Sequence, residues 1–368
     1  MPLSPLFLLS CVALNAPAAD KIYRKGQKQP LQVTVVSEDY AVVKYKPQDV
    51  NQTVEIKAES VDRIEYEDTP EAFRTGQTAL KSGDHLNAVN SFKLALRSRT
   101  RNNWLEVYGN FYLGMAHYQW GAKDPLQYAE AAKAFDATIK AEPKSRFAAE
   151  ALKRWGLALS LSKDPKGAAA VFDRLVVDAR DKKLGISWEA EALILKADAF
   201  AQNNLAAEAT DAYREAGNFA QANAEAQKNP SIKALLQSIR GRAQMSQGEA
   251  LLRSKKHADA QRFFEQVARD PGATPESVAG ALSGLGEVML AQSKVNEAIE
   301  QFSTVKVRFH RVRSEAARAT FFLGESYLLA EPADANHRRR AMEYFREVVE
   351  RYSDTLWAEQ ARAKLKSP

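Results

Sequence analysis

The sequence predicts a mostly α-helical protein, an α-solenoid of about seven helical hairpins that follows a small all-β module. Three observations predict this fold class. A small residue, an alanine and an aromatic residue recur seven times in the same order. Short runs rich in β-branched and aromatic residues precede the first repeat. Pro70 separates the two patterns, because it interrupts the strand spacing and helical spacing begins just after it, at Phe73.

The first 19 residues carry no charged side chain and predict an export signal. The apolar run of residues 6–14 is too short to span a bilayer as a helix. Ala16-Pro-Ala18 provides the small residues of a signal peptidase site, so we expect cleavage near Ala18 or Ala19. Leu8-Leu-Ser-Cys11 keeps an alternative open, in which Cys11 carries a lipid anchor that holds the protein at a membrane surface.

Residues 20–68 predict a small β module. Five short runs alternate apolar and polar residues or are rich in valine, isoleucine and tyrosine: Lys21–Arg24, Leu31–Val36, Tyr40–Tyr45, Thr53–Lys57 and Val61–Tyr66. The second and third runs are joined by Ser37-Glu-Asp39 and read as a hairpin. Four or five such strands are expected to close as a small antiparallel barrel of the Src-homology-3 or Sm-like kind.

Residues 69–368 predict the solenoid, in which two antiparallel helices form each repeat and a last helix caps the array. The small residue on the first helix and the alanine on the second mark points where helices approach closely. The aromatic residue, one turn after the alanine, fills the space between repeats. The seven sets are Gly76, Ala88 and Phe92; Gly114, Ala131 and Phe135; Gly156, Ala168 and Phe172; Ala197, Ala209 and Tyr213; Gly248, Ala260 and Phe264; Gly286, Ala298 and Phe302; Gly324, Ala341 and Phe345.

This pattern resembles the tetratricopeptide repeat family. The closing stretch Tyr344–Arg362 resembles a bacterial cell-envelope subset, which includes the periplasmic division coordinator of the Tol–Pal system and the outer-membrane assembly lipoprotein. The match is incomplete, because the family favours a small residue three positions after the second-helix aromatic, and here only Ala95 and Ala216 fit. The resemblance implies a scaffold of the periplasm or cell envelope that binds a protein or peptide partner.

The resemblance also implies that the first helix of each repeat lines a groove. On this first helix, the residues that point into the groove lie three positions before the small residue, one position after it and four positions after it. A further residue, one turn before the first of these, lies beside them. Aromatic and methionine side chains there are plausible anchors for a partner, and the alternative is that they pack against the next repeat. The candidate partner-binding residues are Tyr108, Phe111, Met115, Tyr118, Arg242, Met245, Arg318 and Phe321.

Basic residues are concentrated in the solenoid. Residues 20–70 contain 8 Lys or Arg against 10 Asp or Glu, whereas the whole chain has a net formal charge of +6. Clustered arginines are candidates for contact with an acidic partner, a phosphate-bearing lipid or a polyanionic wall polymer. The alternative is that cations near helix C-termini complement the helix dipole. We expect no nucleic-acid partner, because the excess is modest. The clustered candidates are Arg308, Arg311, Arg338 and Arg339.

The sequence contains no catalytic constellation. Its five histidines are scattered, and no two lie at metal-ligand spacing on one helix, so we expect neither a metal nor a cofactor. We therefore expect a non-catalytic exported scaffold that binds another envelope protein through its groove. Two alternatives stay open: a lipid-anchored structural subunit of an outer-membrane assembly or transport machine, and binding of a cell-wall polymer by residues 20–68.

Overall fold

The computed structural model describes residues 19–48, 50, 52–330 and 335–366. Almost all of the predicted export signal, residues 1–18, and its alternative lipid site at Cys11 lie outside the described residues. The chain divides into two compact parts, residues 1–162 and 163–368, and each is described by itself. None of the described helices combines the length and the apolar character needed to cross a membrane.

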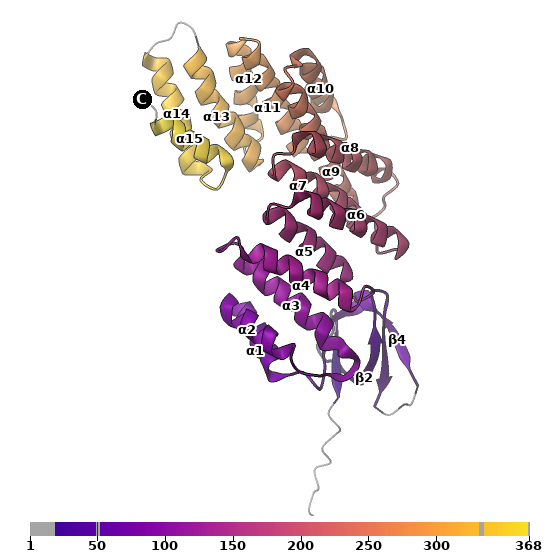
Figure 1. Cartoon of the computed structure of the whole chain (residues 1–368). Helices are drawn as coiled ribbons and strands as arrows, with labels where there is room; N and C mark the ends of the chain where they lie inside the picture. Colours follow the sequence, from indigo (N-terminus) through magenta and orange to yellow (C-terminus); the bar gives the residue numbers. More distant parts are fainter. Residues whose placement is uncertain (1–18, 49, 51, 331–334, 367–368) are drawn as a thin grey trace, which may run out of the picture. The chain divides into compact units, whose positions relative to one another are not determined.

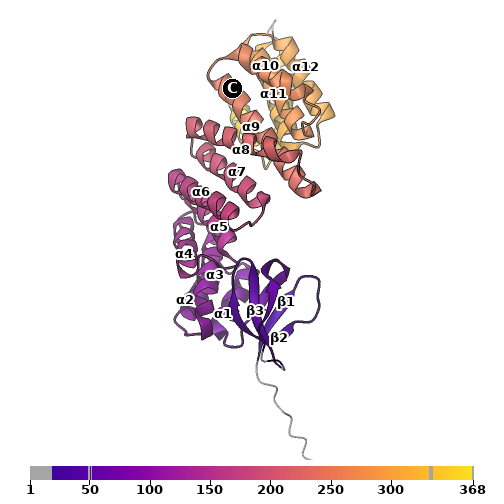
Figure 2. The same ribbon diagram turned by 90° about the vertical axis from the view of Figure 1, so that its right-hand side faces the viewer.

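The N-terminal part begins with a five-stranded antiparallel sheet, as the sequence predicts. The strand order is β4-β3-β2-β1-β5, so β4 and β5 are the outer strands. Figure 2 shows the strands β1, β2 and β3 of this sheet. The pairing of described residues does not join β4 to β5, so the sheet is open at these two strands. The strands are β1 (Asp20–Arg24), β2 (Leu31–Glu38), β3 (Val42–Pro47), β4 (Val54–Lys57) and β5 (Val61–Glu65).

Five helices follow the sheet in the N-terminal part. They are α1 (Glu71–Ser82), α2 (His85–Ala95), α3 (Trp104–Trp120), α4 (Gln127–Ala141) and α5 (Ala148–Leu161). Gly83 ends α1 with a φ of 77°, a left-handed conformation that favours glycine. The Asp84 carboxylate then accepts a hydrogen bond from the Asn87 amide at 3.2 Å and caps α2. These two residues turn α1 and α2 into a hairpin.

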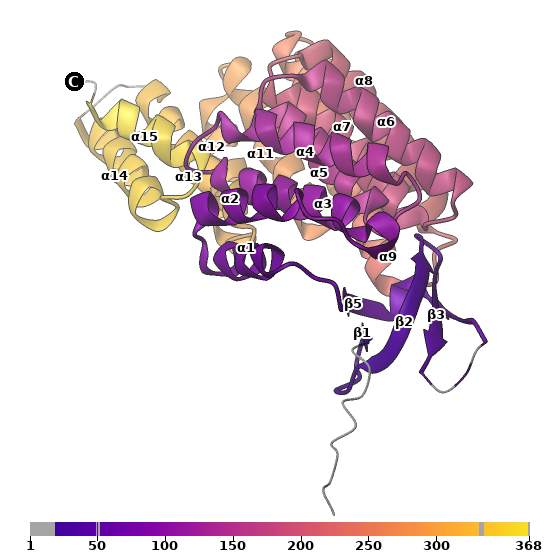
Figure 3. The ribbon, with the colours of Figure 1, turned by 60° about the horizontal axis from the view of Figure 1, so that its bottom comes forward.

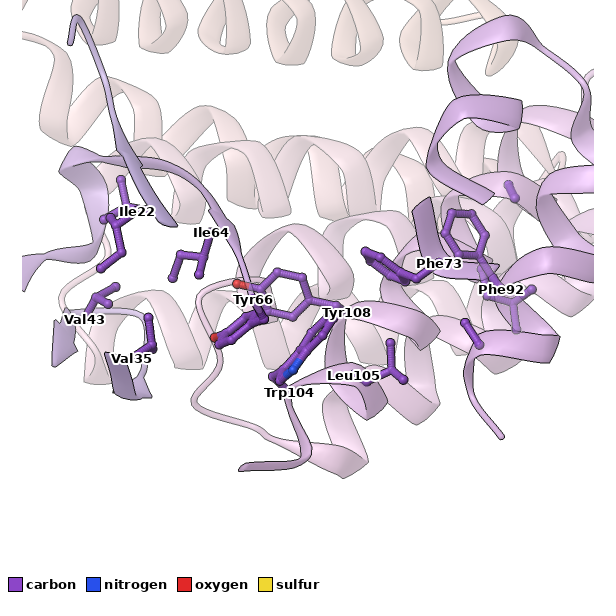
Figure 4. Packing of buried hydrophobic residues seen from close by; sticks show 14 of the residues in the cluster. Ile22, Val35, Val43, Ile64, Tyr66, Phe73, Phe92, Trp104, Leu105 and Tyr108 are labelled. Atoms are coloured by element: carbon purple, nitrogen blue, oxygen red, sulfur yellow. The ribbon is translucent and has the colours of Figure 1, made fainter. Parts of the chain in front are cut away.

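One hydrophobic core joins the sheet to the first helices. Alternate strand residues such as Ile22 and Val43 are fully buried on one face of the sheet. Tyr66, which directly follows β5, stacks on Trp104 with ring centroids 4.4 Å apart (Figure 4). The same core continues to Phe73 on α1. The predicted boundary near residue 68 therefore lies in a short connection that the hydrophobic core crosses.

The C-terminal part consists of helical hairpins (Figure 1). The first helices of successive repeats stack on one another, since α9 contacts both α7 and α11, and α13 contacts both α11 and α15. This stacking is expected of a solenoid, in which each repeat contacts its neighbours. The helices are α6 (Pro165–Asp181), α7 (Ile186–Gln202), α8 (Ala206–Ala224), α9 (Pro230–Arg253), α10 (His257–Arg269), α11 (Pro275–Ala291), α12 (Val295–Arg308), α13 (Arg313–Leu329), α14 (Ala335–Arg351) and α15 (Leu356–Lys366).

The repeated glycines make room for the aromatic ring of their own repeat. A Cβ atom on Gly286 would lie 2.6 Å from the Phe302 ring, and one on Gly114 would lie 2.7 Å from the Phe135 ring. The same relation holds for Gly76, Gly248 and Gly324 with the rings of Phe92, Phe264 and Phe345. At these five glycines the space is therefore filled by a ring, and not by a second backbone as the spacing suggested.

Candidate partner-binding groove

Two of the predicted groove residues on α3 belong to the core of the N-terminal part. Tyr108 is 4% exposed and Phe111 is 7% exposed. The Phe147 ring, just before α5, lies 4.7 Å from the Tyr108 ring and 4.5 Å from the Phe111 ring, measured between centroids. This burial contradicts the prediction that both side chains line an open groove. The segment before α5 covers this face of α3. Tyr108 and Phe111 therefore pack against the next repeat, which is the alternative that the sequence left open.

The other two candidates on α3, Met115 and Tyr118, are half-buried. The Tyr118 ring meets the Tyr128 ring edge-on at 5.7 Å, and the Arg154 guanidinium lies 5.4 Å from the Tyr118 centroid. Burial raises the pKa of Tyr118. Both side chains keep some exposed surface, so a role in partner binding stays a prediction for them.

The candidates on α9 lie at a cavity of about 590 Å³ among α7, α8, α9, α11 and α13. Arg242, Met245 and Glu249 line it from α9, and their spacings of three and four place them on one helix face. Tyr213 lines the cavity from α8, and Glu315 lines it from α13. We call this cavity the C-terminal groove. The structure thus brings Arg242 and Met245 together on an accessible surface.

Glycines and a helix cap set α11 against α9 at this groove. A Cβ on Gly241 of α9 would clash with Ser277 Oγ of α11. A Cβ on Gly280 of α11 would lie 2.7 Å from Met245 Sδ of α9. Thr274 caps α11 by accepting a hydrogen bond from the Ser277 amide at 3.2 Å. The start of α11 is therefore fixed close to α9, and this contact forms the base of the groove.

A hydrogen-bonded ion pair lies beside the groove. The Arg242 guanidinium pairs with the Asp198 carboxylate, and the Tyr213 hydroxyl donates to Asp198 Oδ1 at 2.7 Å. Burial and the Asp198 charge raise the pKa of Tyr213 far above its usual value, so its hydroxyl stays protonated. Burial opposes the charge on Arg242, but Asp198 outweighs burial and raises the pKa of Arg242. Arg242 therefore keeps its charge and Tyr213 keeps its proton through the neutral pH range.

A second group of charges surrounds Arg318 on α13. Its guanidinium lies 2.7 Å from Glu287, 3.3 Å from Glu249 and 3.7 Å from Glu315. Burial opposes the charge on Arg318, but these carboxylates outweigh burial and raise its pKa. Burial raises the pKa of Glu287, and the Arg318 charge opposes this rise. One buried cation is thus shared by three carboxylates, and the carboxylates of Glu249 and Glu315 also face the C-terminal groove.

Arg318 and Phe321 are enclosed by the protein itself. Phe321 is 5% exposed, and its ring centroid lies 5.4 Å from those of Phe345 and Trp357. Arg318 is 7% exposed and has the three carboxylate partners described above. Their burial contradicts the prediction that these two side chains contact a partner directly. Trp357 on α15 and the glutamates already occupy the space around them, which the spacing of α13 alone does not show.

The four clustered arginines are exposed. Arg308 ends α12, where a cation complements the helix dipole, so the alternative explanation fits this residue. Arg338 and Arg339 lie near the start of α14, where the same explanation does not apply. Arg339 Nε lies 3.9 Å from Glu343. A role for Arg308, Arg311, Arg338 and Arg339 in contacting an acidic partner stays a prediction.

The described residues contain no group of three or more His, Cys, Asp or Glu side chains placed to hold a metal ion. The most buried histidine, His117, lies on α3, and its Nδ1 lies 2.8 Å from Gln127 Oε1. Burial lowers the pKa of His117, which keeps the ring neutral at physiological pH. Its contacts are those of a structural histidine within a repeat.

Sequence reasoning did not identify Asp198 and Glu287, which pair with the arginines beside the groove, or Glu315, which lines it. Asp198 follows the small residue of its repeat directly, so the rule that one position after the small residue points inward could have found it. Glu287 follows Gly286 in the same way. Glu315 lies outside those positions, near the start of α13, and only the packing of α13 against α11 brings it to the groove.

Antiparallel helix pairs with stacked first helices define the class of the protein, a helical-repeat protein with a groove along those helices. Residues 126–183 match the tetratricopeptide repeat family. No curated protein gives a significant match.

Matches among solved structures share little sequence with this chain. The apo form of RapI is 11% identical with a TM-score of 0.47, over 79% of each chain. A Rap protein complexed with Competence and Sporulation Factor is 12% identical with a TM-score of 0.35, over 80% of this chain and 95% of that one. The P58(IPK) TPR domain is 17% identical with a TM-score of 0.26, over 80% of this chain and 77% of that one.

Proposed function

We propose that this protein is a non-catalytic scaffold that binds a partner protein through the C-terminal groove. The observation that carries this proposal is the cavity of about 590 Å³ among five helices, which combines the apolar side chain of Met245 with fixed polar groups. Binding sites for small molecules and peptides commonly have this composition, because apolar contact supplies affinity and a few polar groups set orientation. The match to the tetratricopeptide repeat family supports a protein as the partner.

The charges of the groove favour a basic segment of the partner. Glu249, Glu276 and Glu315 line it together with Arg242 and Arg253. Asp198 pairs with Arg242, and Glu249, Glu287 and Glu315 share the single cation Arg318. Carboxylates therefore still outnumber cations at the groove and directly beside it. Complementary charge determines which partner binds and how fast it associates. We therefore expect an extended segment with a lysine or arginine near the glutamates and an apolar side chain against Met245.

Selection from a random-peptide display library on the purified full-length protein tests this function. We expect basic peptides with an apolar residue to be enriched. Replacing Glu276 with lysine should weaken their binding by about tenfold, because the change reverses one charge of the groove and adds repulsion. Glu276 is exposed and lies in the first turn of α11. Fluorescence polarisation with the enriched peptides measures the dissociation constant.

Glu297→Lys is the matched control for this experiment. Glu297 is also exposed and lies in the first turn of α12, so both substitutions have the same effect on a helix dipole. Only Glu276 lines the groove. Two results would show that the peptides do not bind in the C-terminal groove. One is an equal loss of affinity in the two variants, and the other is an affinity that neither substitution changes.

We further propose that the protein is exported and acts in the cell envelope. The charge-free apolar stretch of residues 1–19 and the small residues at Ala16-Pro-Ala18 support export. Intact-mass measurement of the protein from a native envelope fraction is expected to show a chain that begins near Ala19. A lipid-modified chain that begins at Cys11 would favour the anchored structural subunit instead. An unprocessed chain in the cytoplasmic fraction would contradict export.

A further inference from the structure

The N-terminal part contains a second cavity, of about 850 Å³, between the outer strand β5 and helix α1. The chain runs from β5 through a short connection into α1 (Figure 3). Residues of both elements line the cavity. Its lining also includes Trp104, Tyr108 and Tyr112 of α3, the segment at Phe147, and Lys21 and Gln32 from the strands β1 and β2. We call this cavity the N-terminal cleft. Every residue that lines it belongs to the N-terminal part, and the proposed groove function does not involve it.

Aromatic rings line the cleft in two layers. Tyr112 and Phe147 are half-buried and offer the accessible aromatic surface. The rings behind them are buried: Tyr66, Phe73, Trp104 and Tyr108. These rings support one another. Tyr66 stacks on Trp104 (Figure 4). The Phe73 ring meets the Tyr112 ring edge-on at 5.6 Å. A surface of mutually packed rings is rigid and apolar, so it binds an aromatic or aliphatic side chain without a large loss of conformational freedom.

Cations predominate around the cleft. Its lining includes five basic residues, Lys21, Arg63, Arg74, Lys81 and Arg146, and three acidic residues, Asp62, Glu65 and Glu67. Arg63 pairs with Glu65 at 3.1 Å, and Arg74 pairs with Glu71 at 3.5 Å. Lys21 and Lys81 are exposed, and neither forms an ion pair with any residue that the structure describes. These two ammonium groups are therefore available to carboxylates of a ligand.

The backbone of β5 also faces the cleft. β5 pairs with β1 on one side and is an outer strand on the other. The Arg146 guanidinium donates from Nη2 to the Asp62 carbonyl at 2.9 Å, and Asp62 has no partner in the register of β1 with β5. Arg146 thus covers one end of the outer edge. The rest of β5 adjoins the cavity, where an extended chain can lie along it.

We infer that the N-terminal cleft binds an extended acidic segment of a partner protein. One aromatic or apolar side chain of this segment lies against the packed rings, and its carboxylates lie beside Lys21 and Lys81. The charge preference is opposite to that of the C-terminal groove. The protein therefore has two separate peptide sites, one for an acidic segment and one for a basic segment.

A synthetic peptide with glutamates on both sides of one phenylalanine, labelled with a fluorophore, is the probe for the cleft. Fluorescence polarisation with the full-length protein should show binding that weakens with added salt. We expect affinity to fall about tenfold when lysines replace the glutamates, or when alanine replaces the phenylalanine. Lys81→Glu should also weaken binding about tenfold, because it reverses a charge at the cleft. Lys57→Glu, on the other outer strand β4, is the control and should leave affinity unchanged.

A steric variant provides a second test. Gln77 lines the cleft from α1, so Gln77→Trp should fill it and abolish peptide binding. Thr78→Trp places the same side chain on the exposed face of the same helix, so this variant should still bind the peptide. Binding that tolerates both Gln77→Trp and Lys81→Glu would overturn the proposal. A second result would also overturn it. If no peptide binds, and if the protein self-associates in a way that Gln77→Trp abolishes, the cleft binds a second copy of this chain instead.

Discussion

Replacing Arg318 with methionine is expected to destabilise the helices around it by about 3–5 kcal/mol. Arg318 is 7% exposed and is the shared partner of Glu249, Glu287 and Glu315. Removing the cation leaves the buried Glu287 carboxylate without its closest charge partner, and an unpaired buried charge is costly. Thermal unfolding followed by circular dichroism, together with hydrogen exchange in α11 and α13, measures the loss.

The pH dependence of this loss identifies its cause. Burial already raises the pKa of Glu287 above its ordinary value of 4.5, and the loss of Arg318 should raise it further. A carboxyl group whose pKa is higher in the folded state binds more protons when folded, so stability decreases as the pH rises above 4.5. The variant should therefore be most destabilised at neutral pH and recover as the pH falls. If the loss of stability in Arg318→Met does not change with pH, lost packing alone causes it.

Arg262→Met on α10 is the control for Arg318→Met. Its side chain is 79% exposed and pairs with Asp259 one turn earlier on the same helix. Exposed ion pairs of this kind contribute little to stability, so the variant should unfold at nearly the native temperature. A comparable loss in both variants would contradict a special role for the charges around Arg318.

Replacing Gly286 with leucine is expected to destabilise the protein by about 1–3 kcal/mol, because the new side chain overpacks a filled space. A Cβ at this position would lie 2.6 Å from two ring carbons of Phe302, and Phe302 is fully buried. The ring cannot move away without displacing the core between α11, α12 and α13. Chemical denaturation monitored by circular dichroism measures the change.

Gly272→Leu is the control for overpacking. Gly272 is exposed between α10 and α11, and a Cβ there would meet the ends of two flexible side chains, Asp270 at 3.3 Å and Arg240 at 3.5 Å. This variant should lose little stability. If both leucine variants lose the same stability, the contact with the Phe302 ring is not the reason that position 286 requires glycine.

The helical repeats and the strands follow from local sequence, and the structure shows why. A glycine and the phenylalanine of its repeat lie 16 or 21 positions apart in the sequence, and together they form one contact, as at Gly286 and Phe302. The strand prediction for residues 31–36 corresponds to β2 at Leu31–Glu38, because alternating burial is a local property. The core shared between the sheet and α3 was not predictable, since Tyr66 and Trp104 meet only through tertiary packing.

The site is less predictable because accessibility depends on distant segments. The inward-facing rule places Phe111, Met245 and Phe321 at equivalent positions, yet only Met245 lines an open cavity. Phe147 covers Phe111 and Trp357 covers Phe321, and neither covering residue belongs to the helix on which the rule is based. Spacing therefore identifies the face of the helix, whereas the neighbouring segments decide whether that face is available to a partner.

Hydrogen exchange of the full-length protein, with and without a basic peptide enriched in the display selection, tests the central claim most directly. The account predicts slower exchange on peptide binding in α9 and at the start of α11 and α13, where Met245, Glu276 and Glu315 line the C-terminal groove. Protection confined to the exposed arginines of α12 and α14, or to the N-terminal part, would contradict the claim that a partner binds in this groove.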